Sequence, residues 1–288
     1  LLIVKPTEKF SNEEKLKIDQ FVMRGGKLIL FVDKLNAELD SLKTKKGEVV
    51  AYDRGLELND LLYKYGVRIN SDLVMDLQCD FLPFDVNGNG QFELLPWNYF
   101  PVFETKSNHI INKNLGFVSG RFVNSIDTVE VAGIKKTILL SSSPNSRTIA
   151  TPALISVLEN VNAPENDKFK KANIPVAYLL EGKFSSLYNN RLSQAMSDSL
   201  KKYGAVFMPQ GITNNKIIVV ADGDIVLNSV VKGQPIPMGL NPYTYGSQRE
   251  FAFANKDFLQ NCLDYLINSS NLSEAKAKDY TLRLLDKD

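Results

Sequence analysis

The sequence predicts an α/β fold built around one mostly parallel sheet, flanked by helices. Three unbroken apolar runs, each closed by an acidic residue, carry this prediction. An apolar run of this length that stops at a turn is typical of a strand buried on both faces, as in a parallel sheet. The runs and their closing residues are Ile217 to Ala221 with Asp222-Gly223-Asp224, Leu28 to Val32 with Asp33, and Pro175 to Leu180 with Glu181-Gly182.

The first strand, helix and second strand are predicted by their local signals. Leu1 to Val4 is an apolar run closed by Lys5-Pro6. Ser11 and Glu14 have the spacing of a capping box, in which each side chain binds the backbone of the other residue. A helix should therefore run to about Arg24. Gly25-Gly26 then ends it, because glycine adopts a left-handed conformation at little cost.

Further helices are predicted on the same grounds, and one stretch lacks them. The predicted helices are Gly55 to Tyr65, Ser186 to Tyr203, one that begins at Asn255, and a weakly amphipathic one over Ser273 to Asp286. Between them, residues 80–131 are rich in aromatic and turn residues, which indicates a β-rich insertion. We assign residues 1–79 and 132–288 to the α/β domain. The polar segment 162–173 is a candidate linker, or equally a surface loop.

Composition excludes several classes of protein. The chain of 288 residues has 34 Lys and Arg against 33 Asp and Glu, a net charge of +1, which provides no electrostatic footprint for nucleic acid. Cys79 and Cys262 have no CxxC spacing, which argues against a zinc site, although they could pair with each other. No run of about 18 apolar residues is present. Because the chain begins at Leu1 within a strand-like run and without Met, we expect it to be an excerpt of a longer protein.

The motifs for catalysis are weak. His109 is the one histidine, and Ser141 to Ser143 lacks the G-x-S-x-G turn of a nucleophile elbow. Glu181 to Ser186 resembles a phosphate loop but fails its spacing. Asp85 to Glu93 has oxygen ligands at calcium-loop positions, but an Asn-Gly hairpin turn explains the same residues. We therefore predict no catalytic residue, no metal and no cofactor.

The strongest candidates for ligand or partner contacts are Asp222 and Asp224. They follow a central strand, and open α/β sheets bind ligands at the carboxyl ends of their strands. Glu181, Lys183 and Asp33 would be neighbours at the same edge. These carboxylates could hold a magnesium ion, or they could cap the turn. Trp97 could offer an aromatic platform to a sugar or a partner, or fill the core.

Several segments resemble the gliding-motility-associated auxiliary components of ABC transporters, the GldG-like family. They are Lys5-Pro6, Phe10-Ser11, Ile18 to Lys27, Leu94 to Trp97 with Tyr99 to Pro101, Thr137 to Arg147, Val220 to Asp224 and Asn255 to Phe258. The resemblance implies a Rossmann-like fold, similar to the amidotransferase-like domains of ciliary transport proteins, without a functioning active site. It also implies an extracytoplasmic, periplasmic domain of a membrane-anchored inner-membrane protein, with an ABC permease and ATPase as partners.

Three hypotheses of function follow. The first is a non-enzymatic auxiliary or substrate-binding-type domain of an ABC transport system, with a polysaccharide or peptide ligand at the carboxyl edge of the sheet. The second is a metal-assisted hydrolase that uses Asp222, Asp224 and Glu181, which requires these carboxylates to lie close together. The third is a purely structural protein-protein interaction module, marked by a broad exposed apolar patch.

Overall fold

A five-stranded mixed sheet forms the centre of the protein. The computed structural model describes residues 1–44, 47–85, 89–105, 107–157, 166–202 and 204–267. The strands of this sheet lie in the order β1, β2, β15, β14, β11. Their bounds are β1 Leu2–Val4, β2 Leu28–Phe31, β15 Asn215–Val220, β14 Pro175–Gly182 and β11 Ile134–Ser141.

The predicted first unit is confirmed. Helix α1 (Asn12–Met23) begins with the capping box of Ser11 and Glu14. Gly25 follows it with φ +87°, where a side chain would be strained. Strands β1 and β2 are parallel, as the unit requires, and β2 is parallel to β15.

The predicted Rossmann-like, mostly parallel sheet flanked by helices is wrong. Strand β14 runs antiparallel to β15, and β11 runs antiparallel to β14. Helices make up about 20% of the structure, and most of the described strands lie in small antiparallel sheets. A continuous apolar run shows that a strand is buried, but not in which direction its neighbour runs. The apolar runs therefore could not distinguish a parallel sheet from a mixed one.

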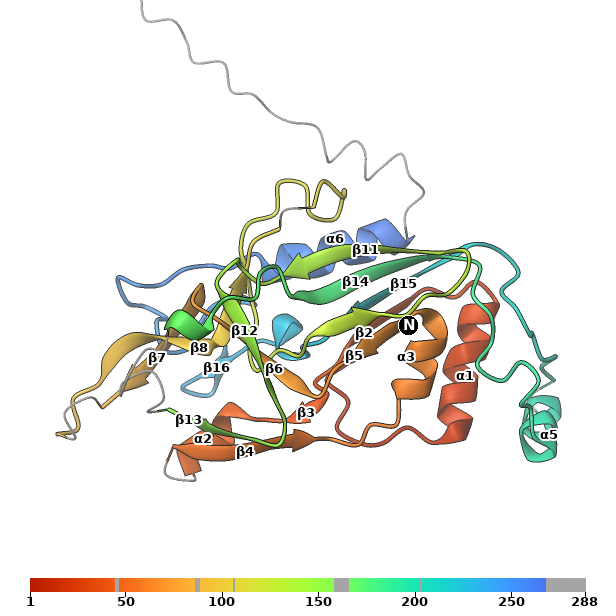
Figure 1. Cartoon of the computed structure of the whole chain (residues 1–288), viewed down its shortest axis with the longest axis horizontal. Helices are drawn as coiled ribbons and strands as arrows, with labels where there is room; N and C mark the ends of the chain where they lie inside the picture. Colours follow the sequence, from red (N-terminus) through yellow and green to blue (C-terminus); the bar gives the residue numbers. More distant parts are fainter. Residues whose placement is uncertain (45–46, 86–88, 106, 158–165, 203, 268–288) are drawn as a thin grey trace, which may run out of the picture.

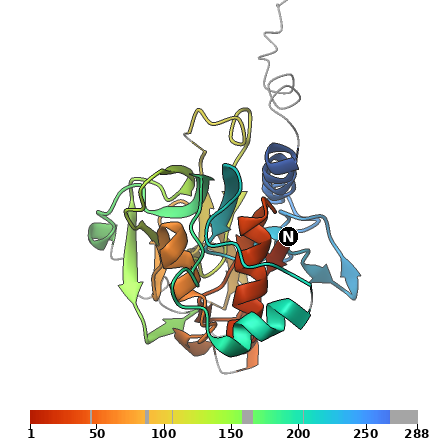
Figure 2. The ribbon, with the colours of Figure 1, turned by 90° about the vertical axis from the view of Figure 1, so that its right-hand side faces the viewer.

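Apolar side chains cover both faces of the central sheet. Helices α1 and α3 (Asn59–Tyr65) pack on one face, with Leu16, Val22 and Tyr65 among the buried residues. Helix α6 (Asn255–Ile267) packs on the other, through Phe258, Cys262 and Leu266. Figure 1 shows α6 above the sheet and α1 and α3 below it, while α5 (Gln194–Lys202) lies at the far end, beside α1 in Figure 2.

Three of the smaller sheets contribute side chains to a third apolar cluster, whereas β5 and β10 contribute to the cluster of α1 and α3. The smaller sheets are β13-β4-β3, β12-β6, β7-β8-β9, β10-β5 and β16-β17. Their bounds are β3 Leu35–Asn36, β4 Glu48–Asp53, β5 Val67–Ile69, β6 Asp72–Asp76, β7 Cys79–Phe84, β8 Glu93–Phe103, β9 Val118–Ser119, β10 Ile126–Thr128, β12 Ser146–Ala150, β13 Ala153–Ser156, β16 Val230–Val231 and β17 Gln234–Pro235. Side chains of the predicted insertion pack in this cluster with Leu35, Ala51 and Ile155. The domain boundaries at 80 and 131 stay a prediction.

Some predicted helices are shorter in the structure. The helix expected from Gly55 begins at Asn59, and the one expected from Ser186 begins at Gln194. Short helix α2 (Leu39–Thr44) precedes β4. The helix expected over Ser273 to Asp286 and the first part of the candidate linker lie outside the described residues.

Cys79 and Cys262 are both free thiols, so they do not form the disulfide that the sequence left open. In the described ranges, no helix has the length and apolar composition needed to cross a membrane.

Candidate functional site

The carboxyl ends of the three parallel strands bring charged residues together. Lys5 directly follows β1, and Asp33 comes two residues after β2. Asp222 and Asp224 follow β15 in the same way, and Asp224 begins the short 3-10 helix η2 (Asp224–Val226). Because parallel strands end at the same edge of a sheet, these four side chains meet there.

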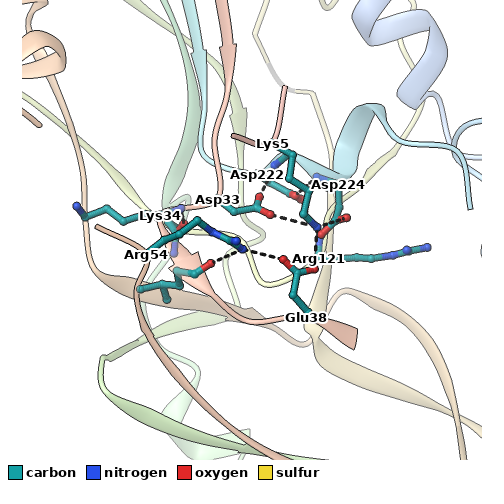
Figure 3. A network of polar contacts seen from close by, with 11 residues as sticks. Lys5, Asp33, Lys34, Glu38, Arg54, Arg121, Asp222 and Asp224 are labelled. Carbon is teal, nitrogen blue, oxygen red and sulfur yellow. Dashed lines mark hydrogen bonds and ion pairs between the residues drawn. The ribbon is translucent and has the colours of Figure 1, made fainter. Parts of the chain in front are cut away.

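Lys5 lies at the centre of this cluster. Its Nζ is 2.7 Å from Asp224 Oδ1, 3.0 Å from Glu38 Oε2 and 3.2 Å from Asp33 Oδ2. The three carboxylates come from three separate segments, and Figure 3 shows them converging on the one ammonium group. An ammonium group has three N–H donors, so these contacts use the full capacity of Lys5.

Backbone amides bind the two most buried carboxylates of this cluster, Asp222 and Asp33. Asp222 is 1% exposed, and its Oδ2 accepts a 2.8 Å bond from the amide of Arg121. Its Oδ1 accepts a 2.7 Å bond from the amide of Asp224. The amide of Gly223 donates to Asp33 Oδ1. The Asp-Gly-Asp turn is therefore capped by Asp222 and by Asp33. The prediction that the carboxylates cap this turn is confirmed for Asp222, whereas the Asp224 side chain binds Lys5.

The pKa values of the cluster follow from burial and from these charges. Burial alone lowers the pKa of Lys5, but the negative charges of Asp224, Asp33 and Glu38 outweigh it and raise this pKa above its ordinary value. Burial, reinforced by the charges of Asp224 and Asp33, raises the pKa of Asp222 well above its usual range. The pKa of Asp33 is raised by burial and by Asp224, although Lys5 opposes the shift.

Arg54 is the second cation of this network, and it binds Glu38. Arg54 Nη2 lies 2.7 Å from Glu38 Oε1 and donates to the carbonyl of Leu35. Glu38 thus bridges Lys5 and Arg54. The carboxylates of the network are matched by neighbouring cations and amides, an arrangement that satisfies buried charges.

Three carboxylates of this cluster have the chemistry of a site for a hard cation, but the Lys5 ammonium already binds two of them. Asp33, Asp222 and Asp224 each offer a carboxylate oxygen within 4.8 Å of the others, as a magnesium or calcium site would. A metal ion would have to displace the Lys5 ammonium from Asp33 and Asp224, or lie beside it against like charge. The residues present therefore fit an internal ion-pair network better than a metal centre.

Glu181 and Lys183 lie at the other end of the sheet. In the antiparallel pair, Glu181 is opposite Lys216, near the start of β15. Asp222 lies six positions after Lys216, which corresponds to about 20 Å at roughly 3.3 Å per residue. Glu181 Oε1 instead accepts a 2.7 Å bond from Tyr265 Oη, and Lys183 is exposed. The structure does not bring Glu181 to Asp222 and Asp224.

Trp97 is a core residue. Its side chain is 0% exposed, and its ring centroid lies 5.0 Å from that of Phe100 and 5.6 Å from that of Phe122. It therefore offers no platform to a ligand at the surface. In the calcium-like segment, Asp85 accepts bonds from the amides of Asn89 and Gly90, whereas residues 86–88 lie outside the described residues.

A cavity of about 570 Å³ adjoins the network on the side of η2 and the β16-β17 hairpin. Lys5, Glu38 and Asp224 contribute to its wall, together with Arg121. The volume is within the range of about 300–1,000 Å³ that is usual for ligand pockets. The carboxyl edge is therefore hollowed, as expected for a binding edge of an open sheet.

Sequence reasoning missed Lys5, Glu38, Arg54 and Arg121 as members of this edge. Lys5 could have been found, because it follows an apolar strand as Asp33 and Asp222 do. Glu38, Arg54 and Arg121 lie in the β-rich segments, and nothing local in their sequence signals where these segments return to the sheet. Only the tertiary structure places them.

Comparison with known proteins identifies a family. The family model described as "ABC-type uncharacterized transport system" matches residues 1–262. Among solved structures, the mmIFT52 N-terminal domain matches with a TM-score of 0.44 and 12% identity, over 93% of this chain and 77% of that chain. At this TM-score and identity, the match does not establish a shared function. The comparison with curated proteins gives no significant match.

Proposed function

The chain belongs to the family described as "ABC-type uncharacterized transport system", and from this premise we propose that it acts as a non-enzymatic, extracytoplasmic auxiliary domain of such a system. Family membership makes it an auxiliary component of an ABC-type transport system. The finer assignment, to a periplasmic domain of a membrane-anchored protein in a gliding-related system, is supported by the resemblance described above. Its partners would be the permease and ATPase subunits.

One observation carries the non-enzymatic assignment. At the carboxyl edge, where an open sheet would place its catalytic groups, the Lys5 ammonium is bonded to Asp33, Glu38 and Asp224. Carboxylates held in this way serve the fold, because they are neither open to a metal ion nor placed beside a nucleophile. The hydrolase hypothesis also requires Glu181 beside Asp222 and Asp224, but Glu181 lies at the other end of the sheet, opposite Lys216.

Partner binding is tested by co-purification. The protein with its membrane anchor, expressed with the permease and ATPase of its own transport system, should retain both subunits through affinity purification in detergent. A parallel preparation with an unrelated ABC permease and ATPase is the control. Failure to retain the cognate subunits, or equal retention of the unrelated ones, would contradict the proposed partnership.

The non-enzymatic assignment is tested by titration with divalent ions. We expect MgCl₂, MnCl₂ and CaCl₂ to leave the melting temperature of the chain unchanged, because the carboxylates are already engaged. The matched control is Asp222→Asn, which removes the negative charge of one of the three carboxylate ligands and so weakens any site for a divalent ion. A rise in melting temperature that Asp222→Asn abolishes would revive the hydrolase hypothesis.

A further inference from the structure

We propose that a second copy of this chain covers the outer face of the β7-β8 hairpin and the aromatic groove beside it, so that the domain forms a two-fold dimer. This interface goes beyond the proposed function, since it joins two copies of the chain and involves neither the permease nor the ATPase. The groove has a volume of about 580 Å³ and lies between the hairpin and residues 248–253. What we call the aromatic face consists of Phe81, Pro83, Phe92, Leu94, Phe117 and Phe251.

The outer face of the hairpin is apolar, although an antiparallel sheet that meets water on one face usually carries polar residues there. Leu82 and Phe84 point inward and pack in the third apolar cluster. Because alternate residues of a strand point to opposite faces, Phe81 and Pro83 lie on the outer face. Leu94 is paired with Pro83 and lies on the same side. The hairpin therefore has the composition of an element that is covered on both faces.

The apolar surface extends beyond the two strands. Phe92, directly before β8, is 68% exposed, and in the groove Phe117 is 40% and Phe251 is 50% exposed. Figure 1 shows β7 and β8 extending away from the central sheet. A set of exposed aromatic side chains beside a groove is typical of an interaction site.

Arg249 joins the hairpin to the groove. Its Cζ lies 5.2 Å from the centroid of the Phe81 ring, and its Nη1 donates a 2.6 Å bond to the carbonyl of Leu94. A guanidinium has five N–H donors, so this exposed side chain keeps donors for a group on another molecule.

The charges of the groove favour a second copy over a partner of one sign. Arg249 is followed by Glu250, which also lines the groove and is exposed. Glu250 Oε2 accepts a 2.6 Å bond from the amide of Gly246, and its carboxylate has further lone pairs. In a two-fold interface the same surface meets itself, so Arg249 of each copy can face Glu250 of the other. A partner of one sign would repel one of these two residues.

The other carboxylates near the aromatic face are bonded within the chain. Asp80 is 7% exposed and accepts bonds from the side chain of Asn241 and the amide of Phe81. Asp85 accepts bonds from amides of its own turn. The net charge of +1 gives two copies no long-range repulsion, and aromatic residues with Arg are enriched in the cores of interfaces. Charge and composition therefore both fit an interface between two copies.

Sedimentation equilibrium of the purified chain tests the dimer. At about 100 μM, well above the dissociation constants of most specific interfaces, the wild type should have twice the monomer mass of 32.3 kDa. Phe92→Ser and Phe251→Ser should each raise the dissociation constant of the dimer by about tenfold or more, as truncation of an aromatic anchor does. Val206→Ser is the matched control, because it removes an exposed apolar side chain that does not line the groove, and it should leave the dissociation constant unchanged.

A mixing experiment tests the two-fold pairing itself. Arg249→Glu leaves two acidic residues at the groove, and Glu250→Arg leaves two basic ones. Each variant alone should be monomeric at the concentration at which the wild type is a dimer, because like charges would meet across the two-fold axis. An equimolar mixture of the two should form dimers, since opposite charges then meet. Sedimentation with a fluorescent label on one variant follows the mixed dimer.

Three outcomes would overturn the proposal. A wild type that stays monomeric at the highest concentration would mean that a different molecule covers the aromatic face. A dimer that Phe92→Ser and Phe251→Ser leave intact would place the interface elsewhere, and a mixture of the charge variants that stays monomeric would exclude the two-fold pairing. If a serine variant fails to fold, the mixing experiment still decides, because it changes only exposed charged residues. The proposed function is tested separately, by co-purification.

Discussion

The Nζ of Lys5 lies 2.7 Å from Asp224 Oδ1, although 219 positions separate the two residues in the chain. This bond ties the end of β1 to the turn after β15, across β2. The side chains of both residues are 15% exposed, so their charges are only partly screened by water.

Replacing Lys5 with methionine should destabilise the fold by about 3 kcal/mol or more at pH 7. Methionine keeps the length of the side chain but removes the positive charge that is paired with Asp33 and Asp224, and breaking a buried pair in this way costs about 3–5 kcal/mol. Urea denaturation measures the change. Lys17→Met, which alters an exposed lysine on α1, should change stability by less than about 0.5 kcal/mol.

The deficit of Lys5→Met should depend on pH. The folded pKa of Lys5 is raised, so its contribution is fully present below the unfolded value of 10.5 and is lost as the pH rises through the folded value. On the acid side, protonation of Asp33 removes the charge that Lys5 balances. The difference between the variant and the wild type should therefore be largest at neutral pH and shrink toward pH 4. A difference that is constant from pH 4 to 8 would contradict this assignment of charges.

Asp222→Asn should make the stability less dependent on pH. The folded pKa of Asp222 is raised by burial and by the charges of Asp224 and Asp33, so ionising it disfavours the fold. In the wild type, its contribution is therefore lost as the pH rises above the unfolded value of 3.8. Asparagine cannot ionise, although its amide must face one of the two backbone N–H groups, at a cost of about 1–3 kcal/mol. Urea denaturation at pH 5 and at pH 8 measures this effect. The free energy of unfolding should fall less between these two pH values in the variant than in the wild type.

Gly223→Ala should destabilise the turn between the two aspartates. An added Cβ would lie 2.7 Å from Lys5 Cβ and 3.0 Å from Lys5 Cα, and the second of these atoms belongs to the backbone. Overpacking of this kind costs about 1–3 kcal/mol. Gly116→Ala is the matched control, because its Cβ would meet Ala254 Cβ at an ordinary 3.5 Å. Equal melting temperatures for the two variants would show that the turn can move away from Lys5.

His109 should make the fold weaker in mild acid. Burial lowers its pKa, and the positive charges of Lys135 and Lys216 add to the shift, while Glu181 opposes it. The folded state prefers the neutral ring, which packs 4.7 Å from the ring of Tyr265. Stability is therefore full above the unfolded value of 6.5 and falls as the pH drops below it. Because the ring is half-buried, the loss at pH 5 should be below about 1 kcal/mol, and His109→Gln should remove it.

The sequence by itself determined the elements whose signals are local. The capping box of Ser11 and Glu14 placed α1, and unbroken apolar runs placed β1, β2 and β15. It also predicted that Asp33, Asp222 and Asp224 would share an edge. That inference succeeded because β2 and β15 are parallel, so equal positions along the two strands meet at the same end of the sheet.

Only the tertiary structure decided the direction of β14, and with it the position of Glu181. The apolar run from Pro175 is equally compatible with a parallel and an antiparallel neighbour, because burial on both faces does not depend on strand direction. The antiparallel pairing with β15 placed Glu181 beside Lys216, far from the aspartates. The tertiary structure also placed Glu38, Arg54 and Arg121 at the carboxyl edge of the sheet. Their positions depend on long-range packing of the β-rich segments, for which a single sequence carries no local signal.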